Sequence, residues 1–168
     1  MAKGIIDFMT SDCEEAKLLR KYYIIKIIPM LNPDGVILGN FRTSVAGTDL
    51  NRRWDDPSKI IHPEIFNTKQ LVISTNQRIG LDLFCDLHGH AGEYNAFIYG
   101  NKSDGLMNQC RMFPLIFSKL NKSFFYSLCS FKMQNFKRGT ARINIFEEIQ
   151  IPNVFTLEAS MIGTNAVF

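Results

Sequence analysis

The amino-acid sequence predicts an α/β fold, with a mixed, largely parallel twisted sheet flanked by helices, and three observations support this prediction. Stretches with helical spacing of apolar residues alternate along the chain with short apolar runs that are typical of strands. Residues 81–87 form a mostly apolar run, as in a strand of a sheet that is covered on both faces. His88 and Glu158 lie near the carboxyl ends of two such runs, where open α/β sheets place their ligands.

The first part of the chain predicts a helix, a strand and a turn. Residues 3–20 carry apolar side chains at largely helical spacing and predict an amphipathic helix, broken near residues 10–12. Residues 22–28 predict a strand. This strand leads into Asn-Pro-Asp-Gly at residues 32–35, which predicts a tight turn because proline fixes φ and glycine allows a positive φ.

The rest of the chain continues the alternation of elements. It predicts helices at residues 63–79, 114–120 and 144–148, and strands at residues 81–87, 95–99, 127–133 and 154–159. No internal repeat, low-complexity segment or linker divides the sequence. We therefore expect residues 1–168 to form a single domain.

The composition fits one cytoplasmic domain and argues against several classes of protein. The 168 residues are 46% apolar and 12% aromatic, which is enough for a core of ordinary size. No apolar stretch reaches the roughly 18 residues of a membrane span, and the N-terminus lacks the apolar segment of a signal peptide. The four cysteines show no C-x-x-C spacing, which favours reduced thiols. The net charge of +3 comes without a basic block, so we expect no nucleic-acid partner.

An arginine-rich segment follows the predicted turn. It contains Arg42 and then Asn51, Arg52 and Arg53, and it ends on Trp54. The planar guanidinium group matches the two oxygens of a carboxylate, and a neighbouring amide adds a neutral donor. We interpret the segment as a carboxylate-binding loop. The alternative is a set of ordinary solvated surface charges.

Two further residues stand out near strand ends. Glu158 is the only charge in the run at residues 154–159, and a carboxylate buried among apolar neighbours is costly unless it is paired or used. The pattern therefore predicts a functional group, and the alternative is an edge strand on which Glu158 points to solvent. His88 lies between Asp86 and Gly89, and an imidazole at a strand end is a common metal ligand or acid–base group.

Five segments occur in an order that resembles the zinc metallocarboxypeptidase family, and more narrowly its cytosolic carboxypeptidase branch. These segments are PMLNPDGV at 29–36, GNFR at 39–42, AGTDLNRRW at 46–54, DLHGH at 86–90 and TLEAS at 156–160. The resemblance covers nearly the whole chain. It implies the carboxypeptidase fold, one zinc ion as cofactor, and removal of C-terminal glutamates from acidic protein tails, with tubulin as one such partner.

The resemblance also implies a role for each site residue. His88 corresponds to the family's third zinc ligand, and Glu158 corresponds to the general base. Arg42 corresponds to the arginine that polarises the scissile carbonyl and holds the developing oxyanion. Asn51 and Arg52 correspond to the pair that binds the terminal carboxylate of the substrate.

Arg142 resembles the basic residue that faces the terminal side chain of the substrate in the cytosolic branch. An arginine at that place would favour terminal Glu or Asp through a charge-assisted contact and would reject apolar ends. Lys137 and Arg138 are alternatives for the same role. All three residues also fit as solvated loop charges.

Two departures from the family pattern set the remaining expectations. The family's first two zinc ligands form a His-x-x-Glu pair, which this sequence lacks, since the residue three after His62 is Ile65. The family's mobile tyrosine has no counterpart after Tyr126, and Phe136 lies near its place without a hydroxyl. We therefore expect a partial catalytic domain, truncated at both ends. The alternatives are a catalytically inactive protein that binds carboxylate tails and an inert structural remnant.

Overall fold

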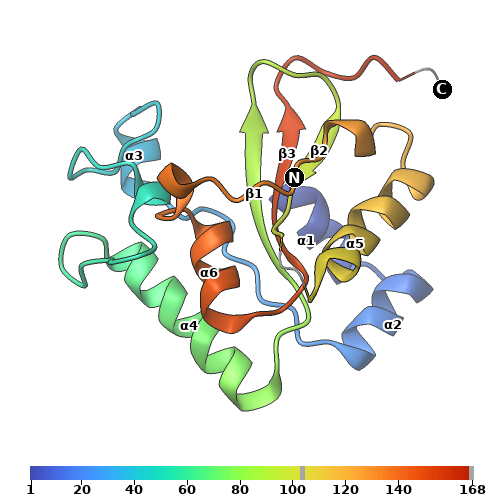
Figure 1. The fold of residues 1–168 in the computed structure, drawn as a ribbon, viewed down its shortest axis with the longest axis horizontal. Coiled ribbons are helices and arrows are strands. Elements are labelled where there is room, and N and C mark those ends of the chain that lie inside the picture. Colours follow the sequence, from blue (N-terminus) through green and yellow to red (C-terminus); the bar gives the residue numbers. More distant parts are fainter. Residues whose placement is uncertain (103–104, 167–168) are drawn as a thin grey trace.

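The computed structural model describes residues 1–102 and 105–166, and a three-stranded sheet lies at its centre (Figure 1). The strands are β1, Phe84–His90, β2, Ala96–Tyr99, and β3, Val154–Ser160. Their order is β1-β3-β2, and β3 runs parallel to β1 and antiparallel to β2. The prediction of a mixed sheet is confirmed, and its central strand is the last one in the sequence.

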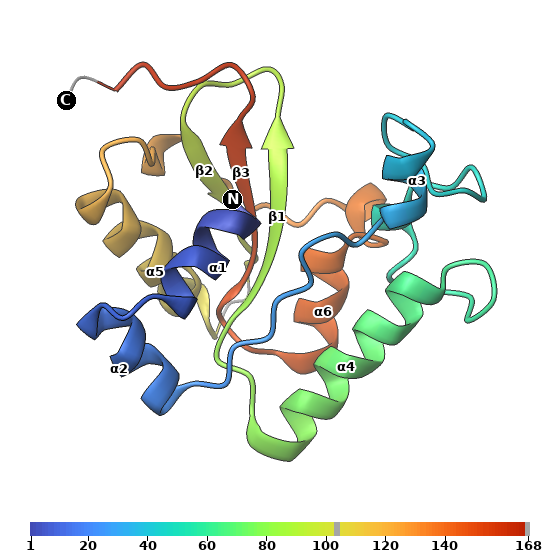
Figure 2. The same ribbon diagram turned by 180° about the vertical axis from the view of Figure 1, so that it is seen from behind.

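Helices flank this sheet on both sides. They are α1, Ala2–Thr10, α2, Glu14–Tyr22, α3, Pro33–Ile37, α4, Pro63–Ile79, α5, Met107–Leu120, and α6, Ala141–Ile149. In both Figure 1 and Figure 2, α4 and α6 lie to one side of the strands, and α1, α2 and α5 lie to the other. None of the helices in the described part of the chain is long and apolar enough to cross a bilayer. The predicted α/β architecture is confirmed.

Local sequence signals set several helix boundaries. Pro63 lies in the first turn of α4, where its missing N–H costs no hydrogen bond, and the helix ends at Gly80, whose φ of 80° suits glycine. The helix predicted at residues 3–20 divides into α1 and α2 around residues 11–13, close to the expected break. The two short helices predicted in the second half of the chain are longer than expected, as α5 and α6.

The strand predicted at residues 22–28 is wrong. Tyr22 ends α2, and the residues that follow have no regular secondary structure. Their apolar side chains are largely exposed, with Ile24 at 74%. An extended run becomes a strand only when another strand pairs with it, and within the described residues this run has no such partner.

The strand predicted at residues 127–133 is also wrong. The 3₁₀ turn Tyr126–Leu128 interrupts the run, and Ser130 forms only an isolated bridge to Tyr99 at the end of β2. Hydrogen bonds still link this segment to β2, with the Ser130 N–H donating to the Ile98 carbonyl at 3.1 Å. The segment therefore borders the sheet without extending it.

The Asn-Pro-Asp-Gly segment begins a short helix and does not form the predicted tight turn. Asn32 caps α3: its side-chain oxygen accepts from the Gly35 N–H at 3.2 Å, and its amide nitrogen donates to the Thr43 carbonyl at 3.1 Å. Gly35 is not among the glycines with positive φ. Glycine is required there for a different reason, because a Cβ would overlap the Asn32 side chain and the Thr43 carbonyl oxygen.

Two apolar clusters hold the elements together. The larger cluster contains Leu50, Trp54, Ile65, Cys110, Ala141, Ile145, Phe146 and Val154. The smaller cluster contains Ile98, Phe124 and Phe155. Because Leu50 and Trp54 belong to the larger cluster, the arginine-rich segment is anchored at both ends of its Asn-Arg-Arg portion.

Replacing Gly35 with alanine should destabilise the domain by about 1–3 kcal/mol, because the added methyl group has no room beside the Thr43 carbonyl. Gly4→Ala is the matched control: Gly4 lies in α1 with open space around it, so alanine should be neutral or stabilise by up to about 1 kcal/mol. Urea unfolding followed by circular dichroism measures both changes. A Gly35→Ala protein as stable as the wild type would contradict this crowded environment.

Candidate active site

His88 and Glu158 lie side by side in the sheet. They occupy paired positions on the parallel strands β1 and β3, so their side chains project from the same face. His88 Nδ1 lies 3.8 Å from Glu158 Oε1. Glu158 is 7% exposed and belongs to the central strand, which excludes the alternative of an edge strand with Glu158 turned to solvent.

Asp86 contacts the other ring nitrogen of His88. It lies on the same strand, and its Oδ2 is 2.7 Å from His88 Nε2. Burial lowers the pKa of His88, but the hydrogen bond and charge of Asp86, together with the charge of Glu158, outweigh burial and raise the pKa above its ordinary value. The sequence marks Asp86 only as a neighbour of His88, and this contact identifies it as part of the site.

Asn51 approaches His88 from the arginine-rich loop. It lies in the 3₁₀ turn Leu50–Arg52, and the side chain of Asp49 caps this turn by accepting from the Asn51 N–H at 3.0 Å. The Asn51 side-chain oxygen accepts from the Ala141 N–H, at the start of α6, at 2.9 Å. The Asn51 amide nitrogen then faces His88 Nε2 at 3.5 Å. The loop and α6 together therefore bring Asn51 to the strand end.

The two predicted arginines of this loop differ in their contacts. Arg42 Nε pairs with Asp49 Oδ2 at 2.6 Å, and this carboxylate also caps the Asn51 turn. The charge of Arg42 is the smallest of the influences on the pKa of His88, and it opposes the rise. Arg52 is exposed, and its Nη1 donates to the Asn51 carbonyl at 2.8 Å. The structure thus places Arg42 within electrostatic reach of His88 and leaves Arg52 open to solvent.

Arg142 is buried in the first turn of α6. It is 4% exposed, and its Nη1 donates to the Gly100 carbonyl and to Asn101 Oδ1, the latter at 2.8 Å. Burial lowers the pKa of Arg142 to about 10, so the guanidinium group stays protonated at neutral pH. The solvated alternative is therefore wrong for Arg142, which is a buried cation just beyond the end of β2.

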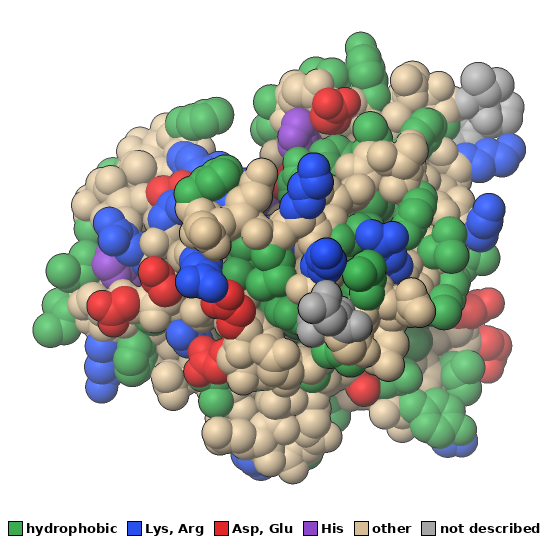
Figure 3. Space-filling model, viewed as in Figure 1, with side chains coloured by type: hydrophobic (Ala, Val, Ile, Leu, Met, Phe, Trp, Pro, Cys, Tyr) green, Lys and Arg blue, Asp and Glu red, His purple; other side chains and the backbone are tan. Residues whose placement is uncertain are grey.

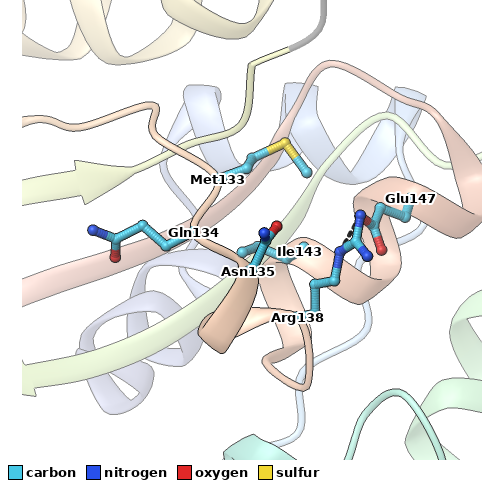
Figure 4. Close-up of a pocket in the computed structure, with 6 residues that line it drawn as sticks. All are labelled: Met133, Gln134, Asn135, Arg138, Ile143 and Glu147. Carbon is cyan, nitrogen blue, oxygen red and sulfur yellow. Dashed lines mark ion pairs between the residues drawn. The ribbon is translucent and has the colours of Figure 1, made fainter.

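The two alternatives to Arg142 point in different directions. Arg138 Nε lies 3.4 Å from Glu147 Oε1, and the two side chains face each other in Figure 4. They line a cavity of about 100 Å³ together with Met133, Gln134, Asn135 and Ile143. Lys137 lies elsewhere, with its Nζ at 5.2 Å from the centroid of the Tyr99 ring.

Tyr99 belongs to the site and was missed by the sequence analysis. It pairs with Thr156, two positions before Glu158 on β3, so it projects from the same face of the sheet as Glu158. Burial and then the charge of Glu158 raise the pKa of Tyr99, which keeps its hydroxyl protonated and able to donate. The sequence predicts a strand at residues 95–99, but this locates Tyr99 beside Glu158 only when the pairing with β3 is known.

The other two histidines serve the local structure. His62 Nδ1 accepts from the Ser58 N–H at 3.2 Å. His90 Nδ1 accepts from the backbone N–H groups of Gly92 and Glu93, at 3.2 and 3.0 Å. Across residues 1–102 and 105–166, no three His, Cys, Asp or Glu side chains are grouped so that they could hold a metal ion. The described residues therefore offer His88 as a single candidate ligand and do not make a complete zinc site.

The folded chain is similar to a solved structure of the same class. It matches the crystal structure of a putative carboxypeptidase A from Shewanella denitrificans with a TM-score of 0.81 and 27% identity, over 94% of this chain and 43% of that one. The fold, the paired His and buried Glu, and the Asn-Arg loop together place the chain in the structural class of the metallocarboxypeptidases.

Sequence comparison gives the family. The sequence profile described as zinc carboxypeptidase matches residues 1–148, so the chain belongs to the zinc carboxypeptidase family. It is 41% identical to cytosolic carboxypeptidase 3 of Mus musculus over 96% of this chain, and 42% identical to cytosolic carboxypeptidase 2 of Xenopus tropicalis over 98% of this chain. The chain spans 17% of the length of each of these relatives.

Asp86→Asn should lower the pKa of His88 relative to the wild type, because burial remains while the carboxylate and its charge are lost. A raised pKa in the folded state stabilises the fold below the unfolded-state pKa near 6.5, and this contribution is lost as pH rises through the folded-state value. The variant should therefore lose stability mainly at acidic pH.

NMR titration of the His88 Cε1–H measures the pKa. Asp82→Asn, the same charge change at an exposed position, is the control, and equal His88 titrations in all three proteins would contradict the contact.

Proposed function

We propose that this chain is part of a zinc carboxypeptidase catalytic domain that removes glutamates from the C-terminal ends of acidic protein tails, such as those of tubulin, in the cytoplasm. The observation that carries the proposal is the pairing of His88 with the buried Glu158, whose Oε1 lies 3.8 Å from His88 Nδ1. The Asn51 amide nitrogen lies 3.5 Å from His88 Nε2. The relatives are named cytosolic carboxypeptidases, which supports both the reaction and the location.

Zinc would require ligands beyond those that the described residues provide. A catalytic zinc takes three protein ligands and keeps an open position for water. His88 would supply one ligand, and we propose that the other two come from a His-x-x-Glu pair outside this chain, as the family pattern implies. When bound, zinc would act as a Lewis acid and lower the pKa of water.

Glu158 would act as the general base. Its carboxylate is buried on the same sheet face as His88, in surroundings where charges interact more strongly than in water. It would take a proton from the attacking water and later deliver it to the leaving amine. No other carboxylate of a described residue is paired with His88 Nδ1.

The loop from Arg42 to Arg52 would bind the end of the substrate chain. The Asn51 amide nitrogen is a neutral donor fixed in direction, because its side-chain oxygen is already bonded to Ala141. The Arg52 guanidinium is exposed and uses Nη1 for the Asn51 carbonyl, which leaves its other N–H groups for a terminal carboxylate. Arg42, held by Asp49, would stabilise the oxyanion that develops on the scissile carbonyl.

Preference for glutamate would come from cations near the end of β2. Arg142 is buried and protonated, and a buried charge contacts an acidic side chain strongly. Lys137 adds a second positive charge beside Tyr99. Figure 3 shows Lys and Arg side chains together with Asp and Glu side chains on one face of the molecule, and the formal net charge of the chain is +3, a sign that favours the approach of acidic tails.

The base assignment is tested in a protein that joins this chain to a His-x-x-Glu segment. Glu158→Gln should slow the release of C-terminal glutamate by roughly 10²–10⁴-fold while zinc remains bound. Glu147→Gln, which alters an exposed carboxylate paired with Arg138, should keep normal turnover. Mass spectrometry of glutamate-tailed peptides gives the rates, and elemental analysis gives the zinc content.

Near-normal turnover by Glu158→Gln would remove Glu158 from the mechanism. If the joined protein without substitutions bound such peptides by their terminal carboxylate but did not cleave them, the chain would instead be a carboxylate-binding module.

The specificity assignment separates two arginines. Arg142→Ala should reduce kcat/KM for Glu-ended peptides by about ten- to a hundredfold more than for Leu-ended peptides, because only the acidic side chain loses its ionic partner. Arg52→Ala should weaken both substrates equally, since both present the same terminal carboxylate. Arg138→Ala is the control from the segment just before α6, because Arg138 is paired with Glu147.

Arg142→Lys distinguishes the loss of charge from the loss of packing, because it keeps the positive charge in the buried position. Equal losses on both kinds of peptide in Arg142→Ala would assign Arg142 a structural role and leave Lys137 as the next residue to test.

A further inference from the structure

We propose that Asp86 is a positioning residue, which accepts the Nε2–H of His88 and so holds His88 in the tautomer whose unprotonated Nδ1 faces Glu158. This inference deepens the proposed function. It rests on that function only in taking the free Nδ1 of His88 to be the nitrogen that would bind zinc. A metal ligand must present an unprotonated nitrogen, and the partner of the other nitrogen decides which one that is. The family resemblance assigns His88 as a ligand and gives no role to Asp86.

Two neighbours of opposite character compete for His88 Nε2. Asp86 Oδ2 lies 2.7 Å away, and an ionised carboxylate only accepts hydrogen bonds. The Asn51 amide nitrogen lies 3.5 Å away and only donates. One ring nitrogen cannot donate to the first and accept from the second at the same time. The contact at 2.7 Å has the length of a strong charge-assisted hydrogen bond, whereas 3.5 Å is at the limit of any hydrogen bond, so Nε2 carries the hydrogen.

Asn51 cannot resolve the conflict by rotating its amide group. Its side-chain oxygen accepts from the Ala141 N–H at 2.9 Å, and rotation would place an NH₂ group against that N–H. The backbone of Asn51 is fixed as well, because its N–H donates to Asp49 at 3.0 Å. Asn51 therefore continues to present a donor to His88, which by itself would favour hydrogen on Nδ1.

Glu158 would favour the same tautomer as Asn51 does, with the hydrogen on Nδ1. Its Oε1 lies 3.8 Å from His88 Nδ1, so a hydrogen on Nδ1 would point toward a buried carboxylate. Asn51 and Glu158 thus both favour the Nδ1–H tautomer, and Asp86 opposes them with the shortest contact. The tautomer of His88 should therefore depend on Asp86 alone among these three neighbours.

Long-range ¹H–¹⁵N NMR of the imidazoles tests this proposal on the chain itself, without metal or substrate. The spectrum is recorded above the raised pKa of His88, where the ring is neutral. His88 should show a protonated Nε2 and an unprotonated Nδ1 in the wild type. Asp86→Leu, which is similar in size and cannot accept, should move the hydrogen predominantly to Nδ1, and Asn51→Ala should leave it on Nε2.

His62 and His90 are internal controls. In both, Nδ1 accepts from backbone N–H groups, so both should show Nε2–H in every variant and report that the fold is intact. Asp86→Ala replaces Asp86→Leu if leucine disturbs the strand.

A wild-type His88 with its hydrogen on Nδ1 overturns the proposal. So does an unchanged His88 tautomer in a folded Asp86 variant, or a switch caused by Asn51→Ala. Because no zinc or peptide is present, failure of the proposed hydrolysis would leave this result standing, and the two can fail separately.

Discussion

The parallel pairing of β1 with β3 is the constraint on which the site depends. Its register sets His88 opposite Glu158, and a slip by one residue would turn one of the two side chains to the other face of the sheet. The register is held by the burial of β3, where Val154 and Phe155 are completely inaccessible to solvent. Burial of those residues therefore fixes the distance between an imidazole and a carboxylate that lie far apart in sequence.

A second set of contacts brings the arginine-rich loop to the same strand ends. The Trp54 N–H donates to the Gly139 carbonyl at 3.0 Å, and Asn51 Oδ1 accepts from the Ala141 N–H at 2.9 Å. Gly139 has no room for a Cβ, because the Arg52 carbonyl oxygen would lie 2.7 Å from it. Two segments about 90 residues apart thus pack backbone against backbone. This contact, together with Trp54 in the core, gives an exposed loop a defined position relative to His88.

Sequence reasoning succeeded where a local pattern was sufficient and failed where the answer depends on distant partners. The lone charge of Glu158 in an apolar strand indicated a buried functional group, and the structure buries it. The apolar run at residues 22–28 also has the pattern of a strand, but among the described residues it pairs with no other strand. Tyr99 and Asp86 were missed as site residues because their relation to Glu158 and His88 is set by strand pairing and side-chain rotamers. The spacing of residues in the sequence reveals neither the strand pairing nor the rotamers.

Two carboxylates beside one imidazole also account for the direction of the His88 pKa. Asp86 and Glu158 lie 2.7 and 3.8 Å from its two nitrogens, and buried negative charges are costly unless a positive charge compensates them. Burial opposes charging of the ring, yet the carboxylates prevail and raise the pKa. With Nε2 bonded to Asp86, the added proton enters at Nδ1, which is also the nitrogen left free for a cation. Proton and metal therefore compete for one atom, and the two carboxylates that favour the proton favour any positive charge at that place.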